Sequence, residues 1–139
     1  MKILVTASRP DSGATVAKLL VSAGHTLTYC HQSDNEAPRC MGVGGAGCPL
    51  TGGDVDVVVD ARAEASAMTT REFGTLCALQ HGTPLVIAGP VPDHRRFPWR
   101  DADVLCVAED VVAGCNVARS PISATARRAV TAAAVRTLK

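Results

Sequence analysis

The sequence predicts a single three-layer α/β domain built on a parallel five-stranded sheet. Five short apolar runs of strand type alternate with helix-type or loop segments, and no change in composition divides the 139 residues. Alternation of this kind is typical of a parallel sheet whose strands are joined by right-handed crossovers. There are also no internal repeats. We therefore predict that residues 1–139 form one domain with a single core.

The strands are predicted from uninterrupted apolar runs. Ile3, Leu4 and Val5 follow one another without polar alternation, which is typical of a strand buried on both faces. Aromatic residues make up only 3% of the chain, so its core must consist mainly of aliphatic side chains. The expected strands span residues 2–7, 26–30, 55–61, 85–88 and 103–107.

The helices are predicted from apolar periodicity and from residues typical of helix ends. Asp11 and Ser12 are good N-cap residues for the first helix, and Gly24 ends it. Gly82 ends the second helix in the same way, and a Ser120–Pro121 pair opens the third. The expected helices span residues 14–23, 69–81 and 120–138.

Charge and hydropathy exclude several classes of protein. The net charge is +1, so we expect no broad surface for nucleic acid or an anionic membrane. No apolar run approaches the 18–20 or so residues of a membrane span. The first residues lack a signal-peptide pattern and start a strand at once. We therefore expect a cytoplasmic protein whose six cysteines do not form a disulfide framework.

Residues 3–28 resemble the opening β-α-β unit of the NmrA-like, atypical short-chain dehydrogenases, which have a Rossmann-type fold. The family's three loop glycines fall at positions 7, 10 and 13, where this chain has Ala7, Pro10 and Gly13. The resemblance implies a dinucleotide site at this turn. The residues that carry it are Ile3 to Thr6, Gly13, Val16, Ala17, Leu19, Leu20 and Ala23 to His25.

The two replaced glycines are the ones that make the tight turn and admit the pyrophosphate. Pro10 also lacks a backbone N–H. We therefore expect that NAD(P) does not bind here with ordinary affinity, although Gly13 keeps the position where helix and strand pack closely. Residues 52–60 resemble the family's strand that lies next to the first, which favours the sheet order 2-1-3-4-5 of Rossmann- or flavodoxin-like folds.

A long loop over residues 31–53 carries cysteines at both ends of a glycine-rich segment. In the order 2-1-3-4-5, Cys48 and Cys77 fall at the same edge of neighbouring strands, and the glycines allow Cys40 to reach them. His81 follows Cys77 by four residues on one helix face. Thiolates and imidazole select soft metals. The pattern predicts an iron–sulfur cluster or zinc held by Cys40, Cys48, Cys77 and His81; unmetallated thiols and a redox-active Cys40–Cys48 pair remain alternatives.

The other cysteines have a simpler interpretation. Cys30 falls at the opposite edge of the sheet, away from the predicted metal site. Cys106 lies inside the fifth strand and is expected to pack as a small apolar side chain. Cys115 lies in a segment without a clear pattern, and we interpret it in the same way.

A basic loop follows the fourth strand, at the edge where open α/β sheets bind ligands. Arg95, Arg96 and Arg100 are candidates for holding an anion, with Trp99 as a stacking surface. The alternative is a surface loop attached to the body by Phe97 and Trp99.

The third strand ends in Asp60 and Arg62 at the same edge. The acid is a candidate general base, and an exposed ion pair is the commoner explanation of such a pair. The leading function is a cysteine-ligated metal or iron–sulfur site with a redox, sensing or assembly role. The alternatives are a small NAD(P)- or nucleotide-binding enzyme or subunit, and an interaction module that binds an unknown protein partner.

Overall fold

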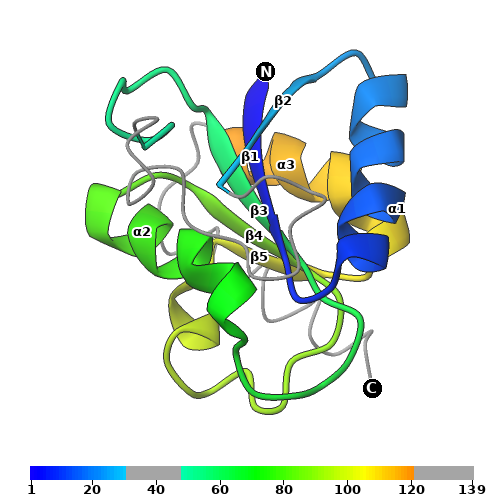
Figure 1. The fold of residues 1–139 in the computed structure, drawn as a ribbon, viewed down its shortest axis with the longest axis vertical. Coiled ribbons are helices and arrows are strands. Elements are labelled where there is room, and N and C mark those ends of the chain that lie inside the picture. The colour runs from blue at the N-terminus through cyan, green and yellow to red at the C-terminus, as the bar shows by residue number, and fades with distance from the viewer. Residues whose placement is uncertain (31–47, 121–139) are drawn as a thin grey trace.

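The computed structural model describes residues 1–30 and 48–120 and confirms the predicted fold class. Its sheet has five strands, all parallel, in the order β2-β1-β3-β4-β5 (Figure 1). The predicted strand order is therefore correct. The strands are β1 (Lys2–Ala7), β2 (Thr26–Tyr29), β3 (Val57–Ala61), β4 (Leu85–Ala88) and β5 (Val104–Cys106).

Helices cover both faces of this sheet. Figure 1 shows α1 and α3 together on one face and α2 on the other, which makes three layers. Short 3-10 turns stand before or between these elements. The helices are α1 (Pro10–Ser22), α2 (Phe73–His81) and α3 (Val111–Arg119), and the 3-10 turns are η1 (Thr70–Glu72), η2 (Trp99–Asp101) and η3 (Ala108–Asp110).

Two apolar clusters hold the layers together, one on each face of the sheet. Alternate residues of β3 supply both: Val57 and Val59 face α1 and α3, whereas Val58 faces α2. All three are fully buried. Burial of a side chain of this size contributes roughly 1.5–3 kcal/mol. The uninterrupted apolar strand predicted from the sequence is thus explained by a core on both sides.

The first helix begins earlier than predicted. Its N-cap is Arg9 and its first residue is Pro10, so Asp11 and Ser12 lie in the first turn and are not caps. Proline suits the first helical position because its φ angle is fixed and its missing N–H is not needed there. The Ser12 hydroxyl completes the turn by accepting a hydrogen bond from the Arg9 N–H at 3.4 Å.

Two other helix predictions differ from the structure. The helix expected from Thr69 begins as the 3-10 turn η1 and becomes α-helical only at Phe73. Helix α3 was not predicted at all. The predicted helix 120–138 lies outside the described residues, apart from Ser120 at the end of α3, and so does most of the loop 31–53. Within the described part of the chain, no helix is long and apolar enough to cross a membrane.

The carboxyl ends of the parallel strands meet at one edge, where β1 turns into α1 (Figure 1). The segments after β3 and β4 leave the sheet here and lie against each other. Gly89 has a φ of +128°, and a Cβ atom built on it would lie 2.1 Å from the carbonyl oxygen of Arg62. Only glycine allows so close an approach. This edge carries the candidate site.

Candidate functional site

A hollow of about 260 Å³ lies at the carboxyl edge, between the ends of β1 and β2 and the first turns of α1. Ligand pockets usually measure about 300–1,000 Å³, so this one suits a small molecule. Among the described residues, its lining combines apolar side chains with one cationic side chain and one aromatic ring. The lining residues are Val5, Thr6, Ala7, Pro10, Gly13, Ala14, Tyr29 and Arg71.

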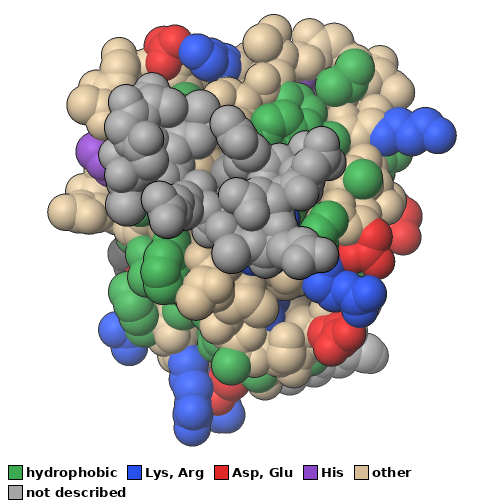
Figure 2. All heavy atoms as spheres, viewed as in Figure 1, with side chains coloured by type: hydrophobic (Ala, Val, Ile, Leu, Met, Phe, Trp, Pro, Cys, Tyr) green, Lys and Arg blue, Asp and Glu red, His purple; other side chains and the backbone are tan. Residues whose placement is uncertain are grey.

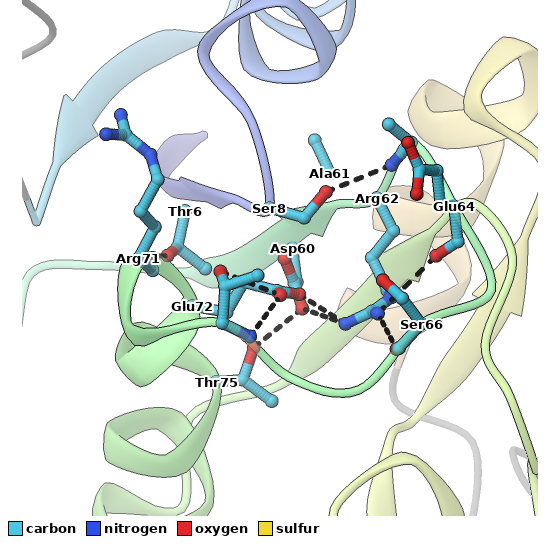
Figure 3. A network of polar contacts seen from close by, with 12 residues as sticks. Thr6, Ser8, Asp60, Ala61, Arg62, Glu64, Ser66, Arg71, Glu72 and Thr75 are labelled. Carbon is cyan, nitrogen blue, oxygen red and sulfur yellow. Dashed lines mark hydrogen bonds and ion pairs between the residues drawn. The ribbon is translucent and has the colours of Figure 1, made fainter. Parts of the chain in front are cut away.

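The cation of this hollow is Arg71, which lies in η1. Its Nε atom is shielded from solvent and finds no hydrogen-bond partner among the described residues. Nor does its guanidinium form an ion pair within residues 1–30 and 48–120. Figure 3 shows the side chain extending away from the carboxylates of Asp60 and Glu72. Within the described part of the chain, the Nε of Arg71 is therefore a donor without an acceptor, on a side chain that lines the hollow.

A buried carboxylate fixes the turn that carries Arg71. Glu72 is fully buried, and its Oε1 accepts hydrogen bonds from the Thr69 N–H at 2.9 Å and the Thr69 hydroxyl at 3.1 Å. Its Oε2 is bonded to the guanidinium of Arg62 (Figure 3). The reciprocal bonds with Thr69 form a capping box, which stabilises the start of a helix.

Arg62 is the centre of this buried network. Its side chain is 0% exposed, and its guanidinium lies 5.2 Å from the ring centroid of Trp99. It also donates hydrogen bonds to the carbonyls of Pro90, at 3.0 Å, and Ser66. The interpretation of Asp60 and Arg62 as an exposed pair is therefore wrong, because both are buried and the arginine joins the segments after β3 and β4.

Asp60 lies next to this network, with its Oδ2 atom 4.0 Å from Arg62 and 3.1 Å from the Thr75 hydroxyl. Burial raises the pKa of Asp60 well above the usual aspartate value, and the neighbouring Glu72 raises it further. The folded state therefore binds this proton more tightly than the unfolded chain does. The stability that this proton provides is therefore fully present below the ordinary aspartate pKa. It is lost as the pH rises from that value through the raised pKa of Asp60 in the folded protein.

The turn between β1 and α1 offers few donors to a phosphate. The Ser8 N–H already donates to the carbonyl of Ala61 at 3.0 Å, the Arg9 N–H donates to Ser12, and Pro10 has none. Gly13 packs as expected of the third glycine, because an added Cβ would lie 3.1 Å from the Cβ of Ala7. The close packing of helix on strand is present at this turn, whereas positions 8 to 10 offer no free N–H to a pyrophosphate.

A second hollow of about 240 Å³ lies on the other side of α1, beside the ends of β3 and β4. Its polar lining includes Asp11, Ser12 and Thr15. Arg62 also borders it, but that guanidinium is bonded to the buried network and fully shielded from solvent. This hollow is therefore less suited to an anion than the one that contains Arg71.

The basic loop after β4 presents its arginines to solvent. The side chains of Arg95 and Arg96 are 78% and 79% exposed, and both pair with Asp93. Trp99 is buried against Arg62, whereas Phe97 is 53% exposed. The loop is thus attached through Trp99 and not through Phe97. On the face shown in Figure 2, the visible Lys and Arg side chains stand apart from one another, several of them beside acidic groups.

Two of the predicted metal ligands lie on the α2 side of the sheet. Cys48 and Cys77 are half-buried against the same apolar cluster, and His81 is exposed at the end of α2. Cys40 lies outside the described residues. Within residues 1–30 and 48–120, no group of three or more His, Cys, Asp or Glu side chains is placed to hold a metal ion. A site that includes Cys40 stays a prediction.

The remaining cysteines pack in the core. Cys106 is buried in β5, as expected, and Cys115 is buried in α3. Desolvation raises the pKa of each thiol to about 12, so neither forms a reactive thiolate near neutral pH. Cys30 is buried at the carboxyl edge, where its sulfur would lie 2.9 Å from a Cβ atom built on Gly74.

Sequence reasoning missed Arg71, Tyr29 and Glu72. The pattern Thr69-x-x-Glu72 in front of an apolar run is a capping-box signature and would have placed a helix start there. Such a start follows β3 directly and therefore lies at the carboxyl edge, which would have brought Arg71 to the ligand-binding side of the sheet. Tyr29 ends β2 at the same edge, where a parallel sheet commonly binds ligands.

Comparisons with known proteins identified no match to this chain. No protein-family model matches the chain, and no curated protein or solved structure matches it significantly. The resemblance of residues 3–28 to the NmrA-like family therefore stays a prediction.

Proposed function

We propose that this chain binds a small organic anion of the nucleoside monophosphate type in the hollow beside β1 and β2. The observation that carries the proposal is the guanidinium of Arg71 in that hollow, whose Nε has no hydrogen-bond partner among the described residues. A shielded polar atom without a partner costs free energy, and an acceptor on a ligand would remove this cost. Arginine is well suited to phosphate oxygens, which it can bind through two parallel hydrogen bonds.

The rest of the lining supports a ligand with a flat or apolar part. Tyr29 offers an aromatic ring at the end of β2, and Val5 and Ala14 offer aliphatic surface. Aromatic rings stack on nucleobases with little dependence on the base. The location agrees with the general rule that open parallel sheets bind ligands at their carboxyl edge.

The size and donor count favour one phosphate over two. The hollow of about 260 Å³ is small, and Arg71 is the one cation among its described lining residues. A pyrophosphate would have to lie over the turn after β1, where the N–H groups of Ser8 and Arg9 are already engaged and Pro10 has none. The proposal therefore assigns binding of a mononucleotide, and no hydride transfer, to this edge.

Replacing Arg71 with methionine tests the proposal. Methionine keeps the length of the side chain but removes the charge and the donors, so we expect the dissociation constant for AMP to rise at least tenfold. Titration calorimetry with AMP, ribose 5-phosphate and adenosine measures this effect. Binding of the uncharged adenosine is expected to change little.

The matched control is Arg100→Met, since Arg100 is exposed on the loop after β4 and does not line the hollow. It should bind AMP as the wild type does. Wild-type protein that binds neither AMP nor ribose 5-phosphate at millimolar concentration would contradict the proposal, and so would an Arg71→Met variant with unchanged affinity.

We propose, as a second function, a thiol-ligated zinc or iron–sulfur site, which is supported by the packing of Cys48 and Cys77 against one cluster. Thiolates of cysteine are the ligands that such metals select.

Anaerobic purification followed by metal analysis tests this second proposal. The Cys48→Ser and Cys77→Ser variants should each lose metal and thermal stability together, because metal binding would then contribute folding free energy. Cys106→Ser should leave the metal content unchanged, and wild-type protein without metal would reject the site.

A further inference from the structure

One residue that lines the hollow is hydrogen-bonded to the backbone of Arg71. Thr6 lies in β1, is 3% exposed, and lines the hollow. Its hydroxyl donates a hydrogen bond to the backbone carbonyl of Arg71 at 2.6 Å. This bond joins β1, which lies between β2 and β3 in the sheet, to a turn 65 residues further along the chain.

The side chain of Thr6 is held in one orientation by its second branch. A Cβ atom built on Gly74 would lie 3.1 Å from the Cβ and 3.2 Å from the Cγ2 of Thr6. The methyl group therefore packs against the start of α2, and the hydroxyl points to Arg71 (Figure 3). A β-branched side chain has few χ1 choices, so this packing also fixes the direction of the hydroxyl.

Glu72, the residue after Arg71, is fixed by bonds to other parts of the chain. Glu72 is bonded to Arg62 and to Thr69, so the residue after Arg71 is tied to the end of β3. With Thr6 holding the carbonyl of Arg71 itself, the backbone at this position is tied to both β1 and β3. The guanidinium then extends into the hollow from a fixed base.

We propose that Thr6 is a positioning residue, whose hydroxyl fixes the backbone of Arg71 so that the guanidinium meets the anionic group of the ligand. The inference rests on the proposed function. Thr6 acts through Arg71 and not by contact with the ligand, because its hydroxyl proton is already donated to the Arg71 carbonyl. Loss of this hydroxyl should therefore weaken anionic ligands selectively.

The test compares Thr6→Val with Thr6→Ser. Valine has the shape of threonine without the donor. We expect it to raise the dissociation constant for AMP about tenfold, because the backbone of Arg71 would lose its anchor and would have to be ordered on binding, at a cost similar to that of one buried hydrogen bond. Serine keeps the hydroxyl and should bind AMP within about threefold of the wild type. Adenosine should bind all three proteins alike. Titration calorimetry gives the affinities, and circular dichroism checks that each variant is folded.

The outcomes separate this inference from the proposed function. If Arg71→Met weakens AMP binding and Thr6→Val does not, Thr6 has no positioning role. If Thr6→Val weakens AMP and adenosine equally, Thr6 contacts the ligand or shapes the hollow, and the inference is again wrong. An unchanged Arg71→Met variant contradicts the proposed function itself. Should Thr6→Val fail to fold, Thr6→Cys replaces it, because a thiol is a much weaker donor and the same selective loss is expected.

Discussion

Replacement of Glu72 by leucine is expected to lower the free energy of unfolding by about 3 kcal/mol or more. The glutamate is fully buried and is bonded to Arg62, whose side chain is also fully buried. Removal of one partner of such a pair leaves a charge in the protein interior, which typically costs about 3–5 kcal/mol. Asp60, 4.0 Å from Arg62, can ionise and offset part of this cost, so we expect the lower end of the range.

Urea denaturation followed by circular dichroism measures this change. The matched control is Glu64→Ala, which removes another glutamate from the same segment. Glu64 and its partner Arg9 are more than half exposed, so the control should cost less than about 1 kcal/mol. Equal effects of the two substitutions would show that the network around Arg62 does not stabilise this edge.

Replacement of Gly89 by alanine is expected to cost about 4 kcal/mol or more. The positive φ of +128° already disfavours any other residue, which accounts for about 1–3 kcal/mol. In addition, the new methyl group would meet the carbonyl of Arg62 at 2.1 Å, a backbone atom that cannot move alone. The hydrogen bonds from Arg62 N–H to Ala88 and from Gly89 N–H to Cys106 would have to shift with it.

Gly24→Ala provides the control for backbone strain alone. Gly24 also has a positive φ, of +89°, but nothing lies within 4 Å of the added Cβ. We therefore expect a loss of about 1–2 kcal/mol, the cost of a left-handed conformation without a clash. Thermal denaturation of both variants measures the difference. If Gly89→Ala costs no more than Gly24→Ala, the ends of β3 and β4 are not packed as closely as described.

The sheet could be predicted from the sequence because its signals are local. β1 and β4 have the predicted bounds, and β3 is fully buried and begins with three consecutive valines. Helix α3 was missed because its nine residues include Gly114 and Asn116, which are weak helix formers, and because its packing on β4 and β5 stabilises it.

The site could not be predicted because it depends on convergence between distant residues. Nothing in the sequence shows that Glu72 reaches Arg62, and a pair such as Asp60 and Arg62 is ordinarily exposed. The role proposed for Arg71 depends on two contacts of this kind. Glu72 is bonded to Arg62 inside the buried network, and the Thr6 hydroxyl is bonded to the backbone carbonyl of Arg71. The spacing of Thr69 and Glu72 can place a helix start at this edge, but it shows neither of these contacts. The position of Gly13 at the first turn, by contrast, could be predicted from its resemblance to a known pattern.

A crystal structure of the protein with AMP tests the proposed binding site most directly. We expect the phosphate within hydrogen-bond distance of the Arg71 guanidinium, with the nucleoside part beside Tyr29 in the hollow between β1, β2 and α1. AMP bound instead at Arg95 and Arg96, or with its phosphate on the turn after β1 and no contact to Arg71, would contradict it.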